Sequence, residues 1–361
     1  ALTNARTEYM NCRAVSPRKI DIHGALSICA KIYTKSIKEI TSSISGKDIE
    51  QKIENTQCSS LTSLGQQQFS VNEVLEFNEN MANPEMIIRS DVDLILNDYK
   101  TMPNKIVVKG HALIKVLYIG DISSGKTDRA EFTIPISQIV DVPGSDENGK
   151  FVIIGEVLSH DEQIRSEGEK STISTDIKIS ATVMAYEDKE IGIVSDVYST
   201  DYELNTELSE MNFKKLFGTF SNNISHKDSI RLSGNNISEI TDIWSDSYSL
   251  TPTVSEGNNI FKGKINVCIL ALDSDKVPFY IERIIEFSHP NSSDEMPPDS
   301  EFESHPVITS IGYSIPNSNT IELKIDFDIF GAIYIPQNRK MVISAKTDES
   351  AQPIKKGDAS L

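Results

Sequence analysis

The 361-residue chain is poor in cysteine, tryptophan and basic residues, and it has no long apolar run. Its 35 lysines and arginines face 53 acidic residues, a formal charge of −18, so nucleic acid and anionic membrane surfaces are poor partners. No segment approaches the roughly 20 apolar residues of a membrane span. Four cysteines without a CxxC pair predict buried free thiols rather than disulfides, typical of a reducing compartment: Cys12, Cys29, Cys58 and Cys268.

The chain also lacks the spacings that hold a metal ion or a catalytic group. His160-Asp161-Glu162 carries acid and base groups, but these are adjacent in sequence, which favours a solvated loop over a catalytic site. No GxSxG motif, no HxH or HxxxH pair and no ordered calcium loop is present among the other candidates: His23, His111, His226, His289, His305, Asp273, Asp275, Asp294, Glu295, Asp299 and Glu301. We therefore predict no catalytic, cofactor-binding or metal-binding residues.

What the chain contains instead is a long-period repeat. Residues 19–33 (KIDIHGALSICAKIY), 172–186 (TISTDIKISATVMAY) and 320–334 (TIELKIDFDIFGAIY) share one pattern, with Ile20, Ile173 and Ile321 aligned at offsets of 153 and 148 residues (173 − 20 and 321 − 173). Residues 107–117 match 260–270 at the first of these offsets. A period of about 150 residues is the size of a domain rather than of a solenoid repeat, which predicts tandem domains.

The repeat predicts the domain boundaries, and the local pattern predicts the fold class. We expect the C-terminal part of a first domain over 1–55, complete domains over 56–206 and 207–348, and a polar linker over 349–361 leading to a further module. Apolar residues alternate with polar ones in all three copies, which favours mainly β, sandwich-like domains. A few short helices are expected around 46–56, 83–90 and 199–216. Gly110 and Gly263 fall at one repeat position, where glycine is typical of a bulge or a close backbone approach.

One phosphate-loop pattern has to be interpreted. Residues 120–127 (GDISSGKT) match GxxxxGK[ST], a loop that binds phosphate when it opens a helix. Residues 130–136 that follow alternate like a strand and include Pro135, and the equivalent loop at 273–278 has no glycine. We predict an exposed hairpin loop that binds no nucleotide.

The repeat units resemble a known family. Residues 104–110, 114–118, 132–135 and 140–144 resemble the SPOCS domain of endospore-forming bacteria, and residues 16–22 are similar to its SxRKxxxR segment, with His23-Gly24 where an arginine is common. Residues 269–273 and 281–283 are similar to the last repeat of the clostridial family member that interacts with the spore coat ATPase SpoIVA. In that member a LysM domain follows and docks the ATPase, and residues 357–361 resemble the approach to it.

The resemblance implies a function, which we keep as an expectation. It implies a non-enzymatic scaffold for spore coat assembly, located in the mother-cell cytoplasm at the forespore surface, with coat proteins as partners. Open sheet edges favour self-association as well. The alternative is a secreted carbohydrate-binding or adhesion sandwich, which would need exposed aromatic platforms; Trp244 is expected in a core instead. A nucleotide-hydrolysing enzyme is a third, less favoured interpretation.

Overall fold

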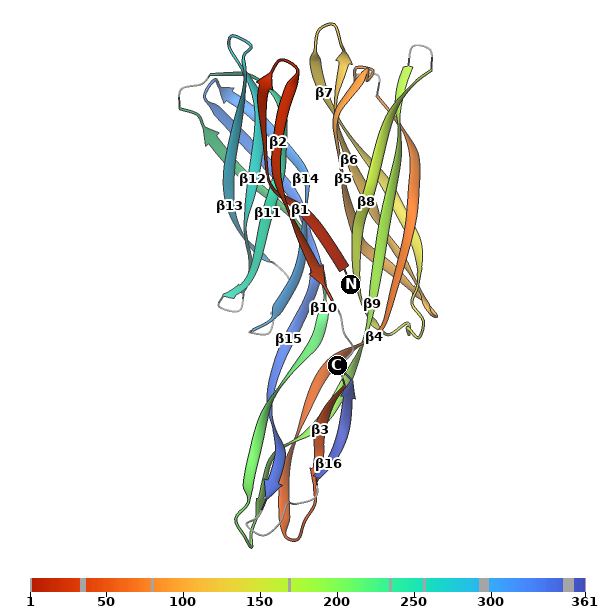
Figure 1. Ribbon diagram of the computed structural model, residues 1–361, viewed down its shortest axis with the longest axis vertical. Coiled ribbons are helices and arrows are strands. Elements are labelled where there is room, and N and C mark those ends of the chain that lie inside the picture. The colour runs from red at the N-terminus through yellow and green to blue at the C-terminus, as the bar shows by residue number, and fades with distance from the viewer. Residues whose placement is uncertain are drawn as a thin grey trace.

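The computed structural model describes residues 2–32, 37–78, 81–167, 170–233, 236–255, 258–291, 299–346 and 354–360, and there it contains β-strands and no helix. The strands form six small antiparallel sheets: four make up two elongated sandwiches, one lies in a narrower body below them, and one is a hairpin at the N-terminus (Figure 1). Since the described residues include no helix, they also include none able to span a membrane. The predicted mainly-β, sandwich-like class is confirmed.

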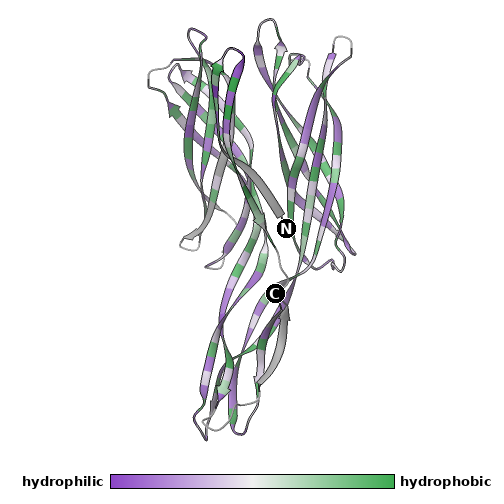
Figure 2. Cartoon of the chain, viewed as in Figure 1, coloured by the Kyte–Doolittle hydropathy of each residue, from purple (hydrophilic) through white to green (hydrophobic). Residues whose placement is uncertain are grey.

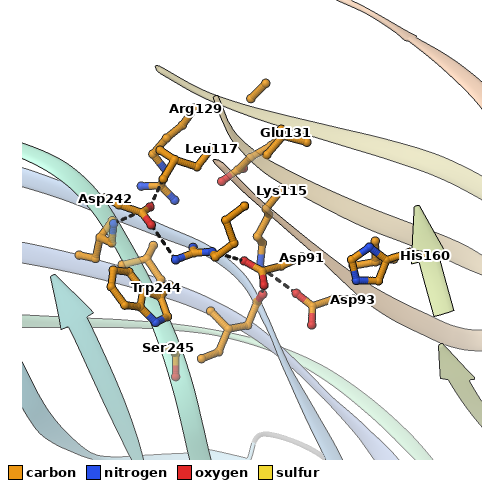
Figure 3. Close-up of a pocket in the computed structure, with 17 residues that line it drawn as sticks. Asp91, Asp93, Lys115, Leu117, Arg129, Glu131, His160, Asp242, Trp244 and Ser245 are labelled. Atoms are coloured by element: carbon orange, nitrogen blue, oxygen red, sulfur yellow. Dashed lines mark hydrogen bonds and ion pairs between the residues drawn. The ribbon is translucent and has the colours of Figure 1, made fainter. Parts of the chain in front are cut away.

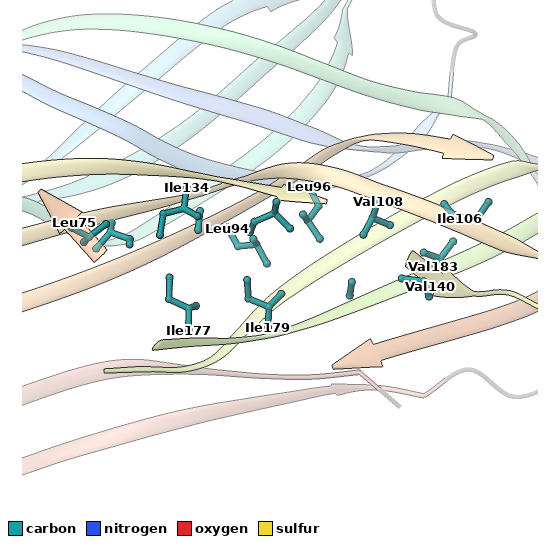
Figure 4. Packing of buried hydrophobic residues seen from close by; sticks show 14 of the residues in the cluster. Leu75, Leu94, Leu96, Ile106, Val108, Ile134, Val140, Ile177, Ile179 and Val183 are labelled. Carbon is teal, nitrogen blue, oxygen red and sulfur yellow. The ribbon is translucent and has the colours of Figure 1, made fainter. Parts of the chain in front are cut away.

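The first sandwich packs two three-stranded sheets face to face. One has the order β4-β9-β8 and the other the order β5-β6-β7. Between them lies a core in which Leu94, Leu96 and Ile134 of one sheet meet Ile177 and Ile179 of the other (Figure 4). The strands are β4 (Ile49–Glu76), β5 (Met86–Met102), β6 (Lys105–Asp121), β7 (Lys126–Asp141), β8 (Lys150–Glu167) and β9 (Lys170–Ser199).

The second sandwich repeats this arrangement strand for strand. Its sheets have the orders β10-β15-β14 and β11-β12-β13, with a core of its own that includes Phe261, Ile269, Ile325 and Phe327. Apolar and polar residues alternate along the strands of both sandwiches (Figure 2). The strands are β10 (Asn205–Arg231), β11 (Ile237–Ser255), β12 (Asn258–Asp273), β13 (Pro278–Asn291), β14 (Glu301–Asn317) and β15 (Thr320–Lys346).

The pairing registers make the two sandwiches equivalent in detail. The repeated segments lie in β9 and β15, each the central strand of its sheet, and the second repeated pair lies in the central strands β6 and β12. In the hairpins β8-β9 and β14-β15 the ladder skips one residue at the same place, Leu158 opposite Ile179 and Thr309 opposite Phe327. This confirms that residues 173–186 and 321–334 are equivalent strands.

The N-terminal copy of the repeat forms a hairpin of two strands, β1 (Leu2–Ser16) and β2 (Lys19–Lys31). Its register is that of β8-β9 and β14-β15, because the ladder skips Glu8 opposite Leu26, which aligns with Ile179. The repeat's last position, Tyr33, lies outside the described residues. The hairpin is therefore a third copy of this element by its backbone as well as by its sequence.

Below the sandwiches, three two-stranded ribbons pack together into what we call the stalk (Figure 1). Two ribbons are the paired ends of β4 with β9 and of β10 with β15, and the third joins β3 (Ile37–Ile44) to β16 (Ile354–Ser360). Every ribbon skips one residue at the same repeat position: Ser42, Ser195 and Ile343. The stalk is thus built from three equivalent ribbons, and residues 354–360, expected in a linker, form a strand of one.

The expected short helices are wrong. Residues 49–56 lie in β4, residues 86–90 in β5, and residues 205–216 in β10. The lysines, glutamates and glutamines of residues 49–56 and 205–216 are good helix formers, but all three segments are held in long ladders. In β4 every second residue is buried at Thr56, Cys58 and Ser60. Tertiary pairing overrides local propensity here.

Glycine and cysteine show how closely the sheets are packed. A Cβ atom on Gly110 would lie 1.8 Å from the carbonyl oxygen of Ile95, and one on Gly263 would lie 2.4 Å from that of Ser249, so both are sites of close backbone approach, as predicted. None of the four cysteines forms a disulfide. The predicted burial is wrong for Cys12 and Cys29, which are exposed on the N-terminal hairpin. It is confirmed for Cys58 and Cys268.

Candidate functional site

A polar pocket of about 290 Å³ lies where the two sandwiches meet. Strands β5, β6 and β7 of the first sandwich contribute Arg89, Lys115 and Arg129, and β11 of the second contributes Asp242 and Trp244 (Figure 3). Arg89, Lys115 and Arg129 lie on the face of the β5-β6-β7 sheet that points away from its core. The site therefore joins two domains.

Asp242 is the centre of the charge network. Its side chain is 2% exposed; its Oδ2 lies 2.7 Å from Arg89 Nη1, and its Oδ1 lies 3.6 Å from Arg129 Nε. Oδ1 also accepts a hydrogen bond of 2.9 Å from the amide of Ile243. Burial raises the pKa of this carboxyl group above its ordinary value, and the two guanidinium groups lower it by less.

Arg89 is fixed from three sides. Its Nε donates to Asp91 Oδ2 at 2.8 Å, its Nη1 pairs with Asp242, and its Cζ lies 4.6 Å from the ring centre of Trp244. The planar guanidinium group binds two carboxylates while it stacks on a ring, an arrangement that lysine does not reproduce. Trp244 is thus half-buried under a guanidinium group at the domain junction, which corrects its expected place in a core.

A second bridge between the sandwiches comes from Lys115. Its Nζ donates to Asp93 Oδ2 at 2.9 Å and to the carbonyl oxygen of Ile308, on β14 of the other sandwich, at 2.6 Å. Arg89 and Asp242 meanwhile occupy equivalent register positions, opposite Leu117 of β6 and Leu270 of β12. One repeat position thus carries opposite charges in the two domains, and the two residues bind each other.

The phosphate-loop pattern lies in the hairpin between β6 and β7, and none of its residues 120–127 lines this pocket. Residues 121–126 are exposed, and Gly125 takes a positive φ of 66°. The amide of Ser123 donates to Asp121 Oδ1 at 2.9 Å, an Asx-type turn, and β7 rather than a helix follows. Asp273 begins the equivalent loop in the same way, accepting from the amides of Asp275 and Val277. The predicted exposed hairpin loop is confirmed; nucleotide binding stays untested.

His160, Asp161 and Glu162 lie in β8, not in a loop, which corrects that expectation. The Glu162 side chain is buried, its Oε2 lies 3.0 Å from His160 Nδ1, and its Oε1 accepts from Thr175 Oγ1 at 3.1 Å. Ser90 of β5 donates to the same carboxylate. Strand alternation turns Glu162 inward, where these contacts join β5, β8 and β9.

The other candidates do not converge on a site. His226 Nδ1 lies 3.3 Å from His289 Nε2, and burial followed by the neighbouring His226 lowers the pKa of His289. Glu301 pairs with Lys214 at 2.5 Å, whereas Asp294 and Glu295 lie outside the described residues. Within the described ranges no group of three or more histidines, cysteines or acids could hold a metal ion.

Sequence reasoning missed the junction. Asp242 stands between Ile240 and the pair Ile243-Trp244, so an acid inside an apolar strand was the available signal. Its partners Arg89 and Arg129 lie about 150 and 110 residues away, and only the packing of two domains brings them together.

Comparison with known families bears directly on the strands around this site. The SipL SPOCS domain model matches residues 83–161, which span β5, β6, β7 and most of β8. The chain contains a SPOCS domain. No curated protein and no solved structure matches the chain. The matched SPOCS segment supplies Arg89, Lys115 and Arg129, and the third repeat supplies Asp242 from the strand equivalent to β5.

Proposed function

We propose that the chain is a sporulation protein that acts as a non-enzymatic scaffold in spore coat assembly. The SPOCS domain at residues 83–161 carries the link to sporulation. The scaffold role is supported by the domain junction, where Asp242, Arg89 and Lys115 hold two sandwiches in one arrangement. Sandwiches fixed in this way present long surfaces at defined spacing to partner proteins.

The partners in this proposal are coat proteins at the forespore surface in the mother-cell cytoplasm. A SpoIVA-type coat ATPase is one such partner, and the two sandwiches provide the surfaces that bind coat proteins. The alternative, a secreted carbohydrate or adhesion module, gains no support from Trp244, because Arg89 covers the ring that a sugar would need to stack on.

The test combines localisation with binding. In a sporulating host, a fluorescent fusion of the chain should accumulate at the forespore surface. The purified chain should capture coat proteins from sporulating cells, and Arg89→Met should reduce capture by disordering the junction. Lys126→Ala, in the exposed β6-β7 loop, is the matched control and should capture them fully. A diffuse fusion, or capture unaffected by Arg89→Met in a folded variant, contradicts the proposal.

A further inference from the structure

The N-terminal hairpin presents to solvent a face that both sandwiches bury. Leu26 is 71% exposed and Ile28 is 72% exposed, whereas Ile179 and Ala181, their repeat equivalents in β9, are each 0% exposed. The other equivalents, Phe327 and Ile329 of β15, are 1% and 0% exposed. Ile20 and Ile22 extend the same apolar stripe along β2.

Backbone geometry shows that this face has the shape of the buried ones. In this hairpin the ladder skips one residue at the same position as in β8-β9 and β14-β15. The skipped residue is Glu8 here, and Leu158 and Thr309 in the other two hairpins. Since a register slip of one residue would turn the stripe to the other face, the shared register fixes its direction. In both sandwiches a three-stranded sheet, β5-β6-β7 or β11-β12-β13, covers the equivalent face.

The stalk shows that a strand distant in sequence can pair with the N-terminal copy of the repeat. There β3 pairs with β16, more than 300 residues away, in the register that β4 and β10 use with their own partners. Strand β2 pairs with β1 along one edge. Within the described chain its sheet has two strands, whereas each sheet of the sandwiches has three.

We propose that the apolar face of β2, formed by Ile20, Ile22, Leu26 and Ile28, is a binding surface for a three-stranded antiparallel sheet of the SPOCS type. The occupant places the alternating apolar residues of a sheet such as β5-β6-β7 against this stripe, about 10 Å from β2, and so builds a third sandwich beside the other two. A sheet is the occupant because both sandwiches cover the equivalent stripe with a three-stranded sheet.

The test supplies such a sheet and measures whether the hairpin receives it. A second copy of residues 49–149, which comprise β4 to β7 and the connection to β8, is fused ahead of residue 2 of the full chain. Amide exchange in β2 should slow at least about tenfold, and binding of a hydrophobic dye should fall. Leu26→Glu in the fusion should abolish both changes. His23→Glu, on the other face of β2 and equivalent to the exposed Asp176, should abolish neither.

Three results would overturn the proposal. The fused sheet could leave exchange and dye binding unchanged while spectroscopy shows the parent sandwiches folded. Leu26→Glu and Ile28→Glu fusions could both gain as much protection as the parent fusion. Finally, sedimentation of the unfused chain could show a dimer with β2 protected, which would assign the face to a second copy instead.

Discussion

Strands β2 and β9 have the same apolar pattern and the same hairpin register, yet one lies in water and the other at the centre of a core. Ile179 is fully buried between two sheets, while Leu26 is exposed on a sheet of two strands. Pattern and register are local properties of strand and hairpin. Burial depends on a second sheet, so the comparison separates what a repeat encodes by itself from what its partner layer adds.

Placing a charge at equivalent positions gives the largest contrast between these regions. Ile179→Glu or Phe327→Glu buries an unpaired carboxylate in a sandwich core, so we expect a loss of about 4 kcal/mol or more of unfolding free energy. Leu26→Glu should change it by less than about 0.5 kcal/mol. Urea unfolding of the three variants checks this, and an equal loss for Leu26→Glu would show that the hairpin is already covered in solution.

The contrast also explains how far the sequence could be interpreted. The repeat predicted β9 and β15 as equivalent strands, because alternation and spacing are written along the chain. Helices were predicted wrongly at residues 49–56 and 205–216, because pairing with a distant strand determines the structure there. The predicted burial of Cys29 was wrong for a similar reason, because the residue pattern of β2 does not show whether another layer of the protein covers the strand.

The candidate site was less predictable still, because charge pairs between domains leave no local pattern. Asp242 and Arg89 come from equivalent positions of two repeats, but that equivalence does not show that the two side chains meet, which only the packing of the domains reveals. The hairpin at residues 120–127 was predictable, since the strand that follows rules out the phosphate-loop helix. Sequence thus gives strands and turns more readily than it gives the meeting of domains.

The junction offers the next contrast, between a buried ion pair and an exposed one. Arg89→Met leaves Arg129 as the only arginine beside Asp242, and we expect the unfolding free energy to fall by about 2 kcal/mol. This is less than the roughly 3–5 kcal/mol expected for breaking a fully buried pair, because Arg129 remains and Arg89 is partly exposed. Lys324→Met, which removes the partly exposed pair with Asp326, should cost about 1 kcal/mol or less. Chemical denaturation measures both, and equal losses would contradict a special role for the junction.

The contributions of Asp242 and Asp326 to the unfolding free energy should change with pH in opposite directions. The raised pKa of Asp242 means that its contribution to stability is present below its ordinary pKa and is lost as pH rises through the folded-state pKa. Hydrogen bonds from Lys324 and Ser225 lower the pKa of Asp326, so its contribution is lost as pH falls. As pH rises above the ordinary pKa of aspartate, wild type should lose stability relative to Asp242→Asn. As pH falls below that ordinary pKa, wild type should lose stability relative to Asp326→Asn. The same sign for both would show that the arginines outweigh burial at Asp242.

The smallest effect is expected at the two equivalent loops, where the sandwiches differ in sequence but share a turn. Lys126 follows Gly125 at the exposed end of β6-β7, and Asp121 holds the turn through the amide of Ser123. Because the lysine does not form the turn, Lys126→Ala should change the unfolding free energy by less than about 0.5 kcal/mol. Asp121→Ala should destabilise the protein more than Lys126→Ala through its lost hydrogen bonds, as should Asp273→Ala in the other loop. Calorimetric titration of ATP into wild type and Lys126→Ala completes the comparison: we expect no binding to either, and binding lost on substitution would restore the phosphate-loop interpretation.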